Sequence, residues 1–109
     1  MLFYSILTVW LPLTRTNLEN GCLQILPRTH GTGLLDHVTK PELGTVIVDE
    51  QMPDIEPLVL EMEKGSVLLM DKKIPHRSTP NHSSGIRWSM DLRYQKTGTP
   101  SGRPIYPDF

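Results

Sequence analysis

The most constraining feature of this sequence is a strictly alternating segment near its C-terminal end. Apolar side chains occupy every second position between residues 86 and 94, and polar side chains lie between them. The apolar set is Ile86, Trp88, Met90, Leu92 and Tyr94. Successive side chains of a β-strand point to opposite faces, so the pattern predicts a strand with one apolar and one polar face. Arg87 therefore belongs to the polar face.

Several other segments are predicted to be strands. Leu2 to Leu11 is rich in β-branched and aromatic residues and is stopped by Pro12, so we expect a strand buried on both faces. The pair Asn20-Gly21 predicts a turn that needs positive φ. The remaining expected elements are strands at 22–26, 45–49, 57–62 and 66–70, a long surface connection at 28–43 with a short helical turn near Leu34 and Leu35, and a proline-bearing tail at 95–109.

Length and composition limit what these strands can form. A chain of 109 residues makes one small domain, and its net charge of −1 has no basic or acidic run that would indicate nucleic acid or a membrane surface as partner. The single cysteine, Cys22, excludes an internal disulfide and favours a reducing, cytoplasmic compartment. Short strands between Pro/Gly turns, without an amphipathic helix, argue for an all-β sandwich or barrel over residues 1–94, followed by the tail.

One histidine and one arginine are candidate functional residues because of their positions on the predicted strands. His76 follows the strand at 66–70, and Arg87 lies on the polar face of the last strand. Neutral imidazole is a good ligand for iron, and a guanidinium can bind a carboxylate through two parallel hydrogen bonds that lysine cannot reproduce. The two residues therefore suit a metal ligand and an anion clamp that share one cavity.

Short motifs over nearly the whole chain together resemble a known family. In order they read Trp10-Leu-Pro-Leu, Glu19-Asn-Gly-Cys-Leu, Pro27-Arg-Thr-His30, Gly33-Leu-Leu, Glu63-Lys-Gly65, His76-x-Ser78, Asn81 and Arg87. Their order and spacing are similar to the C-terminal half of phytanoyl-CoA dioxygenase family proteins. The resemblance implies a double-stranded β-helix, the jelly-roll architecture shared with cupins, here incomplete, with about six of the eight core strands.

The resemblance also implies an activity and a site. Such proteins use iron(II) and 2-oxoglutarate to hydroxylate or halogenate a small-molecule substrate, and two histidines and one carboxylate hold the iron. By motif, His76 matches the distal histidine ligand, and Arg87 matches the arginine that grips the far carboxylate of 2-oxoglutarate. Ser78 and Trp10 match positions that line the cosubstrate pocket. No side chain of the chain is assigned a catalytic role of its own.

Two departures from the family pattern shape the expected behaviour. The first two iron ligands of the family come from a His-x-Asp motif, and none of the four histidines here begins one. We therefore expect a fragment that is inactive alone, with open strand edges and a bare apolar face that lead to homo-oligomers. The second departure is Arg28-Thr29, where the family usually has Gly-Ser.

Other functions fit the same sequence. A non-catalytic jelly-roll module for binding or interaction would keep the pocket without the metal chemistry. A cupin-type isomerase or sugar-binding protein fits the fold but not the spacing from His76 to Arg87.

Each candidate residue also has a purely structural interpretation. Arg87 would then pair across strands with Asp91 or Glu61, a contact worth under about 1 kcal/mol if exposed. Trp10 would be a core residue and His76 a turn histidine. The other histidines carry no assignment: His30 is expected to hydrogen-bond within its loop, and His37 and His82 are expected to be solvated.

Overall fold

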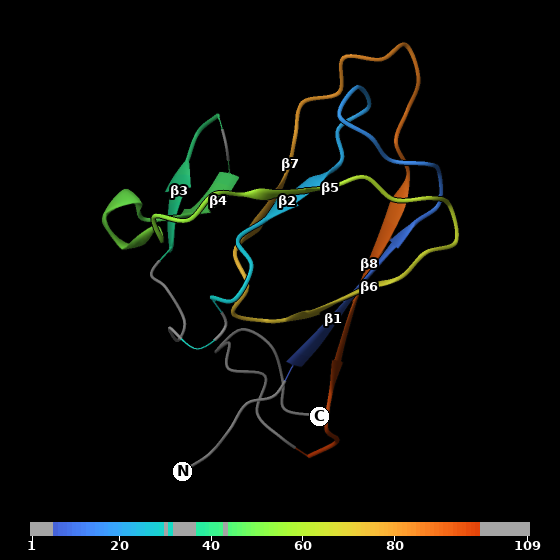
Figure 1. The fold of residues 1–109 in the computed structure, drawn as a ribbon. Coiled ribbons are helices and arrows are strands. Elements are labelled where there is room, and N and C mark those ends of the chain that lie inside the picture. Colours follow the sequence, from blue (N-terminus) through green and yellow to red (C-terminus); the bar gives the residue numbers. More distant parts are fainter. Residues whose placement is uncertain (1–5, 30, 32–36, 43, 99–109) are drawn as a thin grey trace.

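The computed structural model describes residues 6–29, 31, 37–42 and 44–98, and these residues are almost entirely strands and turns (Figure 1). The elements are β1 (Ile6–Pro12), β2 (Leu23–Ile25), β3 (His37–Lys40), β4 (Gly44–Ile47), the 3₁₀ turn η2 (Asp49–Gln51), β5 (Leu58–Leu60), β6 (Leu68–Asp71), β7 (His76–Ser78) and β8 (Ser89–Gln95). No α-helix occurs among the described residues. Within the same residues, no helix has the length and apolar character needed to span a membrane.

Six of the strands form two three-stranded antiparallel sheets. One sheet has the order β6-β1-β8 and the other the order β5-β2-β7, while β3 and β4 form a separate hairpin. From β5 onward, successive strands alternate between the two sheets, as the winding of a double-stranded β-helix requires. The fold class is therefore confirmed as all-β and of the jelly-roll kind. The two sheets hold six strands, the expected number, but β7 was not predicted, and the predicted strand at 45–49 lies in the hairpin instead.

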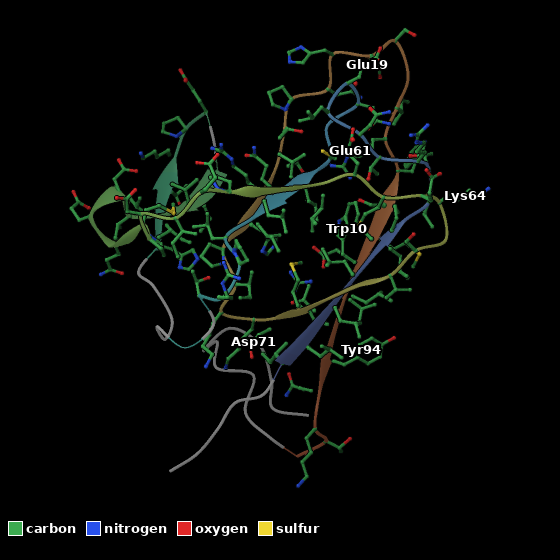
Figure 2. All side chains as sticks on the ribbon, in the orientation of Figure 1. Trp10, Glu19, Glu61, Lys64, Asp71 and Tyr94 are labelled. Atoms are coloured by element: carbon green, nitrogen blue, oxygen red, sulfur yellow. The ribbon has the colours of Figure 1, made fainter. Side chains whose placement is uncertain are left out.

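The core lies between the two sheets and is small. Trp10 of β1, Leu23 of β2 and Met70 of β6 are its buried centre. Figure 2 shows Trp10 between the sheets. The ladder places Leu68 opposite Trp10 and Met70 opposite Thr8, so these side chains share the inner face of their sheet.

The strand β1 corrects the sequence prediction of a strand buried on both faces. Its inner residues Thr8, Trp10 and Pro12 are buried, but Leu7 is 42% exposed and Val9 is only half-buried. The apolar run resembles a fully buried strand because both faces are apolar. In the described residues, nothing packs over the outer face of the sheet β6-β1-β8 tightly enough to bury it.

The apolar side chains near the C-terminal end lie mostly outside: Ile86, Trp88, Met90 and Tyr94 are exposed, and Leu92 is half-buried. Trp88 and Tyr94 are 60% and 58% exposed, and Tyr94 points away from the sheet interior in Figure 2. The polar residues Ser89 and Asp91 lie opposite Pro12 and Trp10 on the inner face. Regular pairing begins at Ser89, three residues later than the predicted start of the strand.

The hairpin β3–β4 corrects another prediction. The sequence indicated a long surface connection at 28–43, but His37–Lys40 pairs in register with Gly44–Ile47. Three of the four residues of β3 are exposed, so no apolar periodicity marks the strand. The expected helical turn at Leu34 and Leu35 lies outside the described residues. The other predicted strands are present with shorter bounds.

The strand that carries His76 and the strand that follows Arg87 lie at sheet edges. β8 is the outer strand of one sheet and β7 the outer strand of the other. Among the described residues, the expected edge is confirmed for the strand of His76, and Arg87 lies two residues before the other edge strand, β8. Each of these two strands therefore leaves one side of its backbone without a strand partner in this part of the chain.

Candidate functional site

Arg87 is held in place by hydroxyl groups from both sheets. Its Nη2 donates to Ser78 Oγ at 2.9 Å, and Ser78 belongs to β7. Its Nη1 donates to Ser89 Oγ at 3.0 Å, at the start of β8. A guanidinium has five N–H donors in a fixed planar arrangement, so two bonds orient the group and leave other donors for a ligand.

Trp10 forms the floor beneath this arginine. The Cζ atom of Arg87 lies 5.6 Å from the centroid of the Trp10 ring. A cation over an indole face is attracted by the ring quadrupole, and the flat guanidinium suits that position. Trp10 is thus both a buried core residue and a contact of Arg87, so the two interpretations of this residue are compatible.

The interpretation of Arg87 as a partner for a cross-strand acid is wrong. Asp91 forms its ion pair with Arg93 instead, and Glu61 Oε2 accepts a hydrogen bond from the backbone N–H of Leu18 at 3.0 Å. Among the described residues, Arg87 has only hydroxyl acceptors and no carboxylate partner. A half-buried cation without a counter-ion is the expected state of a site that binds an anion.

A tight loop contact sets the end of β7 and thereby the position of Ser78. Thr79 donates to the carbonyl oxygen of Cys22 from its N–H at 2.9 Å and from its Oγ1 at 2.8 Å. Gly21, with φ +96°, passes so close that a Cβ there would lie 2.7 Å from the Thr79 carbonyl oxygen. The predicted Asn20-Gly21 turn is present, and its glycine is needed for this close approach as well as for its φ.

His76 lies on the same strand as Ser78 and on the same face. Two residues apart on a strand, their side chains point to one side, and the ladder places Ile25 opposite His76 and Leu23 opposite Ser78. Leu23 and Ile25 pack in the core, so this is the inner face. The structure therefore directs His76, Ser78 and Arg87 to the same interior side, although His76 itself is exposed.

One hydrogen bond fixes the protonation pattern of the His76 ring. Nδ1 lies 3.0 Å from the carbonyl oxygen of Ile74. A carbonyl oxygen can only accept, so Nδ1 donates, and in the neutral ring Nε2 carries the free lone pair. Ring orientation by a backbone carbonyl is the arrangement usual for metal-binding histidines.

The residues present fit 2-oxoglutarate better than they fit iron. For a dicarboxylate they offer a preoriented guanidinium and two serine hydroxyls. For iron, no group of three or more His, Cys, Asp or Glu side chains that could hold a metal ion exists among the described residues. His37 is exposed on β3, and His82 uses its backbone N–H to bond Glu19 O at 2.7 Å. His30 lies outside the described residues.

The structure thus brings together three of the four sequence-predicted site residues, Arg87, Ser78 and Trp10, and places the fourth, His76, on the same face. Ser89 and Gly21 were not identified as site residues from the sequence. Ser89 had a signal, because it shares the polar face of its strand with Arg87. For Gly21, the sequence indicated the turn but not its contact with Thr79.

Strands that alternate between two sheets, with an arginine held over a tryptophan at the edge of the interior, define the chain as a double-stranded β-helix domain with a cationic interior site. A family model described as phytanoyl-CoA dioxygenase (PhyH) matches residues 3–89. The chain belongs to the phytanoyl-CoA dioxygenase family.

Three curated relatives match over most of this chain but only part of their own length. A phytanoyl-CoA dioxygenase domain-containing protein 1 homolog from Dictyostelium discoideum is 31% identical over 79% of the chain and 33% of the relative. A phytanoyl-CoA dioxygenase from Arabidopsis thaliana is 27% identical, over 90% and 40%. A peroxisomal phytanoyl-CoA dioxygenase from Rattus norvegicus is 29% identical, over 82% and 28%. The chain spans roughly a third of the length of these relatives. No solved structure matches it.

Proposed function

We propose that this chain forms the cosubstrate-binding side of an iron(II)- and 2-oxoglutarate-dependent dioxygenase domain that acts on a small molecule. Arg87 holds the far carboxylate of 2-oxoglutarate. The observation that carries the proposal is the oriented guanidinium, bound to Ser78 and Ser89 over Trp10, without a carboxylate partner among the described residues. Family membership supports the dioxygenase class.

The contacts of Arg87 support selection of a carboxylate over other groups. The guanidinium plane is oriented before the ligand arrives, so a carboxylate that forms two parallel hydrogen bonds loses little further side-chain entropy. Ser78 Oγ accepts from Arg87, so its own proton is free to donate to the same carboxylate. Arg87 therefore binds and orients 2-oxoglutarate and does not take part in the oxidation.

His76 is the proposed metal ligand through Nε2. Its position on the inner face of β7 and its Nδ1 bond to Ile74 O support this role. One histidine does not make an iron site, and the described residues supply no further group for it. The metal-dependent step therefore needs ligands in addition to those described.

The direct test is a titration of the 109-residue chain with 2-oxoglutarate. Binding is monitored through the Nε–Hε signals of the arginine side chains in NMR spectra. Arg87→Ala should weaken binding roughly 10- to 100-fold, since a charge-assisted hydrogen bond contributes about 1.5–3 kcal/mol. Arg87→Lys should restore only part of it. 2-Oxobutyrate, which lacks the far carboxylate, should bind the wild-type chain no better than 2-oxoglutarate binds Arg87→Ala.

The neighbouring Arg77 provides a matched control. It lies on the same strand as Ser78 but on the opposite face, where its Nε donates to Gln24 Oε1 at 2.8 Å. Arg77→Ala removes one positive charge at nearly the same place and should leave the affinity for 2-oxoglutarate unchanged. Equal affinities of the wild-type and Arg87→Ala chains would end the proposal.

The described residues hold only one of the expected metal ligands, His76, and this favours a second candidate, a non-catalytic jelly-roll module that binds a dicarboxylate. It predicts the same dependence on Arg87 but no 2-oxoglutarate turnover in any longer natural form of the protein. Succinate release by such a form, in the presence of iron(II) and oxygen, would exclude this second function.

A further inference from the structure

A hollow of about 350 Å³ lies at the end of the sandwich where β2 finishes and β6 turns towards β7. Its size is within the range of small-molecule sites. Most of its lining is apolar, and two of its residues carry charge. The lining consists of Ile25, Pro27, Arg28, Leu68, Leu69, Met70, Asp71 and Ile74.

Two lining residues of the hollow, Ile25 and Ile74, are neighbours of the proposed metal ligand, His76. Ile25 lies opposite His76 in the ladder between β2 and β7. The carbonyl oxygen of Ile74, another lining residue, accepts the hydrogen bond from His76 Nδ1. The N–H of Leu26 also bonds Pro75 O at 3.1 Å, so the two walls are tied together beside His76. A molecule held in the hollow would therefore lie next to His76.

Arg28 is unusual in both its backbone and its side chain. Its φ is +61°, which makes it the only residue other than glycine with positive φ among those the structure describes. A left-handed conformation costs a residue with a Cβ roughly 1–2 kcal/mol. Its side chain is exposed, and within the described part of the chain it has no hydrogen bond or ion pair.

The other charged lining residue is engaged locally. Asp71 Oδ1 accepts from the N–H of Lys73 at 2.9 Å, and the Asp71 carbonyl accepts from the N–H of Ile74 at 3.1 Å. These contacts shape the turn between β6 and β7. Although Asp71 and Arg28 line the same hollow, they form no ion pair. The Arg28 cation is therefore available to a ligand, and a strained arginine beside an apolar hollow is a candidate binding residue.

We propose that this hollow is a substrate subsite that takes a compact apolar group carrying one anionic group, which Arg28 binds. The assignment as a substrate subsite rests on the proposed function, because it depends on His76 as the metal position. It gives this chain two separate anion contacts: Arg87 for the cosubstrate and Arg28 for the substrate.

The test uses three compounds that carry an anionic, a neutral or a cationic group on the same cyclohexane ring: cyclohexanecarboxylate, cyclohexanemethanol and cyclohexanemethylamine. Each is titrated into the 109-residue chain, and backbone amide shifts of Ile25 and Met70 report on the hollow. The carboxylate should bind roughly three- to fivefold more tightly than the alcohol, and the amine most weakly, since one exposed ion pair contributes up to about 1 kcal/mol.

Two variants separate the charge of Arg28 from other effects. Arg28→Gly removes the charge and also the strain of the positive φ, so this variant should fold at least as well as the wild-type chain. Its affinities for the carboxylate and the alcohol should differ by no more than about twofold. Arg15→Gln is the control, because Arg15 pairs with the distant Glu63 and its loss should leave the preference intact. Equal binding of the three compounds, or a preference that persists in Arg28→Gly, overturns the proposal, as does failure of all three to bind.

The same variants distinguish this proposal from the proposed function. The carboxylate preference should persist in Arg87→Ala, and 2-oxoglutarate affinity should persist in Arg28→Gly. If the wild-type chain shows the preference but does not bind 2-oxoglutarate, the cosubstrate assignment fails and the hollow remains an anion-selective site. If 2-oxoglutarate binds as predicted and the preference is absent, only the substrate subsite fails.

Discussion

The side chain of Arg87 connects two sheets that are otherwise joined through the core. Its bonds to Ser78 on β7 and Ser89 on β8 cross between them at their edges. Both serine hydroxyls are neutral. The contacts therefore fix the orientation of the guanidinium but do not balance its positive charge. A role in binding an anion explains this arrangement of Arg87 better than a role in stabilising the fold.

Arg28 should be a source of instability that glycine removes. The family resemblance placed Gly-Ser where this chain has Arg28-Thr29, and the structure gives Arg28 a φ of +61°. The left-handed conformation of Arg28 destabilises the folded state by roughly 1–2 kcal/mol. In the glycine variant that strain is absent, but the unfolded chain is more flexible, which cancels about half of the gain. Arg28→Gly should therefore raise the free energy of unfolding by about 0.5–1 kcal/mol in urea titration. A lower value would show that the arginine side chain stabilises this turn.

Gly21 should tolerate no side chain, for a reason that can be separated from its φ. Gly21→Ala would add both left-handed strain and a Cβ 2.7 Å from Thr79 O. Gly65 is the control, since its φ is +87° but an added Cβ would meet nothing within 4 Å. We expect a loss of about 2–4 kcal/mol for Gly21→Ala and about 1 kcal/mol for Gly65→Ala, measured by urea unfolding. Similar losses in the two variants would show that the contact with Thr79 yields easily.

At the scale of elements, the sequence predicts best where side-chain pattern and local turn chemistry agree. The strand predicted at 86–94 is found as Ser89–Gln95, and the Asn20-Gly21 turn is found as predicted, because each depends on a few neighbouring residues. Of the hairpin β3–β4, the strand β4 was predicted as 45–49, but β3 was missed because its exposed residues have no core to impose an apolar pattern. Which face of β1 and β8 is buried depends on what covers the sheet, and that is not encoded in the strand itself.

The outer face of the sheet β6-β1-β8 should cause self-association. Large apolar side chains on it are strongly exposed, among them Leu69, Trp88 and Tyr94. Exposed apolar patches and open strand edges favour association with a second copy. In sedimentation velocity the 109-residue chain should therefore form oligomers, and Leu69→Lys with Tyr94→Lys should shift it towards monomer.

The control for this experiment is Leu18→Lys with Leu58→Lys. Both leucines are about as exposed, at 54% and 47%, but neither belongs to the sheet β6-β1-β8. The control should leave the distribution of species unchanged. A single monomer peak for the wild-type chain, together with cooperative thermal unfolding, would contradict the prediction. It would show that the 109-residue chain folds stably without association.

At the scale of the whole molecule, the candidate site could be predicted only in part. The grouping of Arg87, Ser78 and Trp10 followed from motif order, and the structure shows these contacts. Their role in cosubstrate binding stays a prediction. The hollow beside His76 could not be predicted, because it is built from residues far apart in sequence, such as Ile25 and Met70, which only the pairing of sheets brings together.

Iron binding depends on several ligands from different parts of a polypeptide and not on a single residue. Because the described residues contain no group of three potential ligands, the 109-residue chain should bind iron(II) more weakly than about 1 mM and release no succinate from 2-oxoglutarate. In a longer polypeptide that supplies a His-x-Asp pair, His76→Ala should abolish iron-dependent turnover, whereas Arg87→Ala should mainly raise the KM for 2-oxoglutarate. His82→Ala is the matched control, since His82 contributes a backbone N–H to its loop and should leave both quantities unchanged. Stoichiometric iron in the 109-residue chain after anaerobic reconstitution would contradict the first expectation. Full activity of His76→Ala in the longer polypeptide would remove His76 from the metal site.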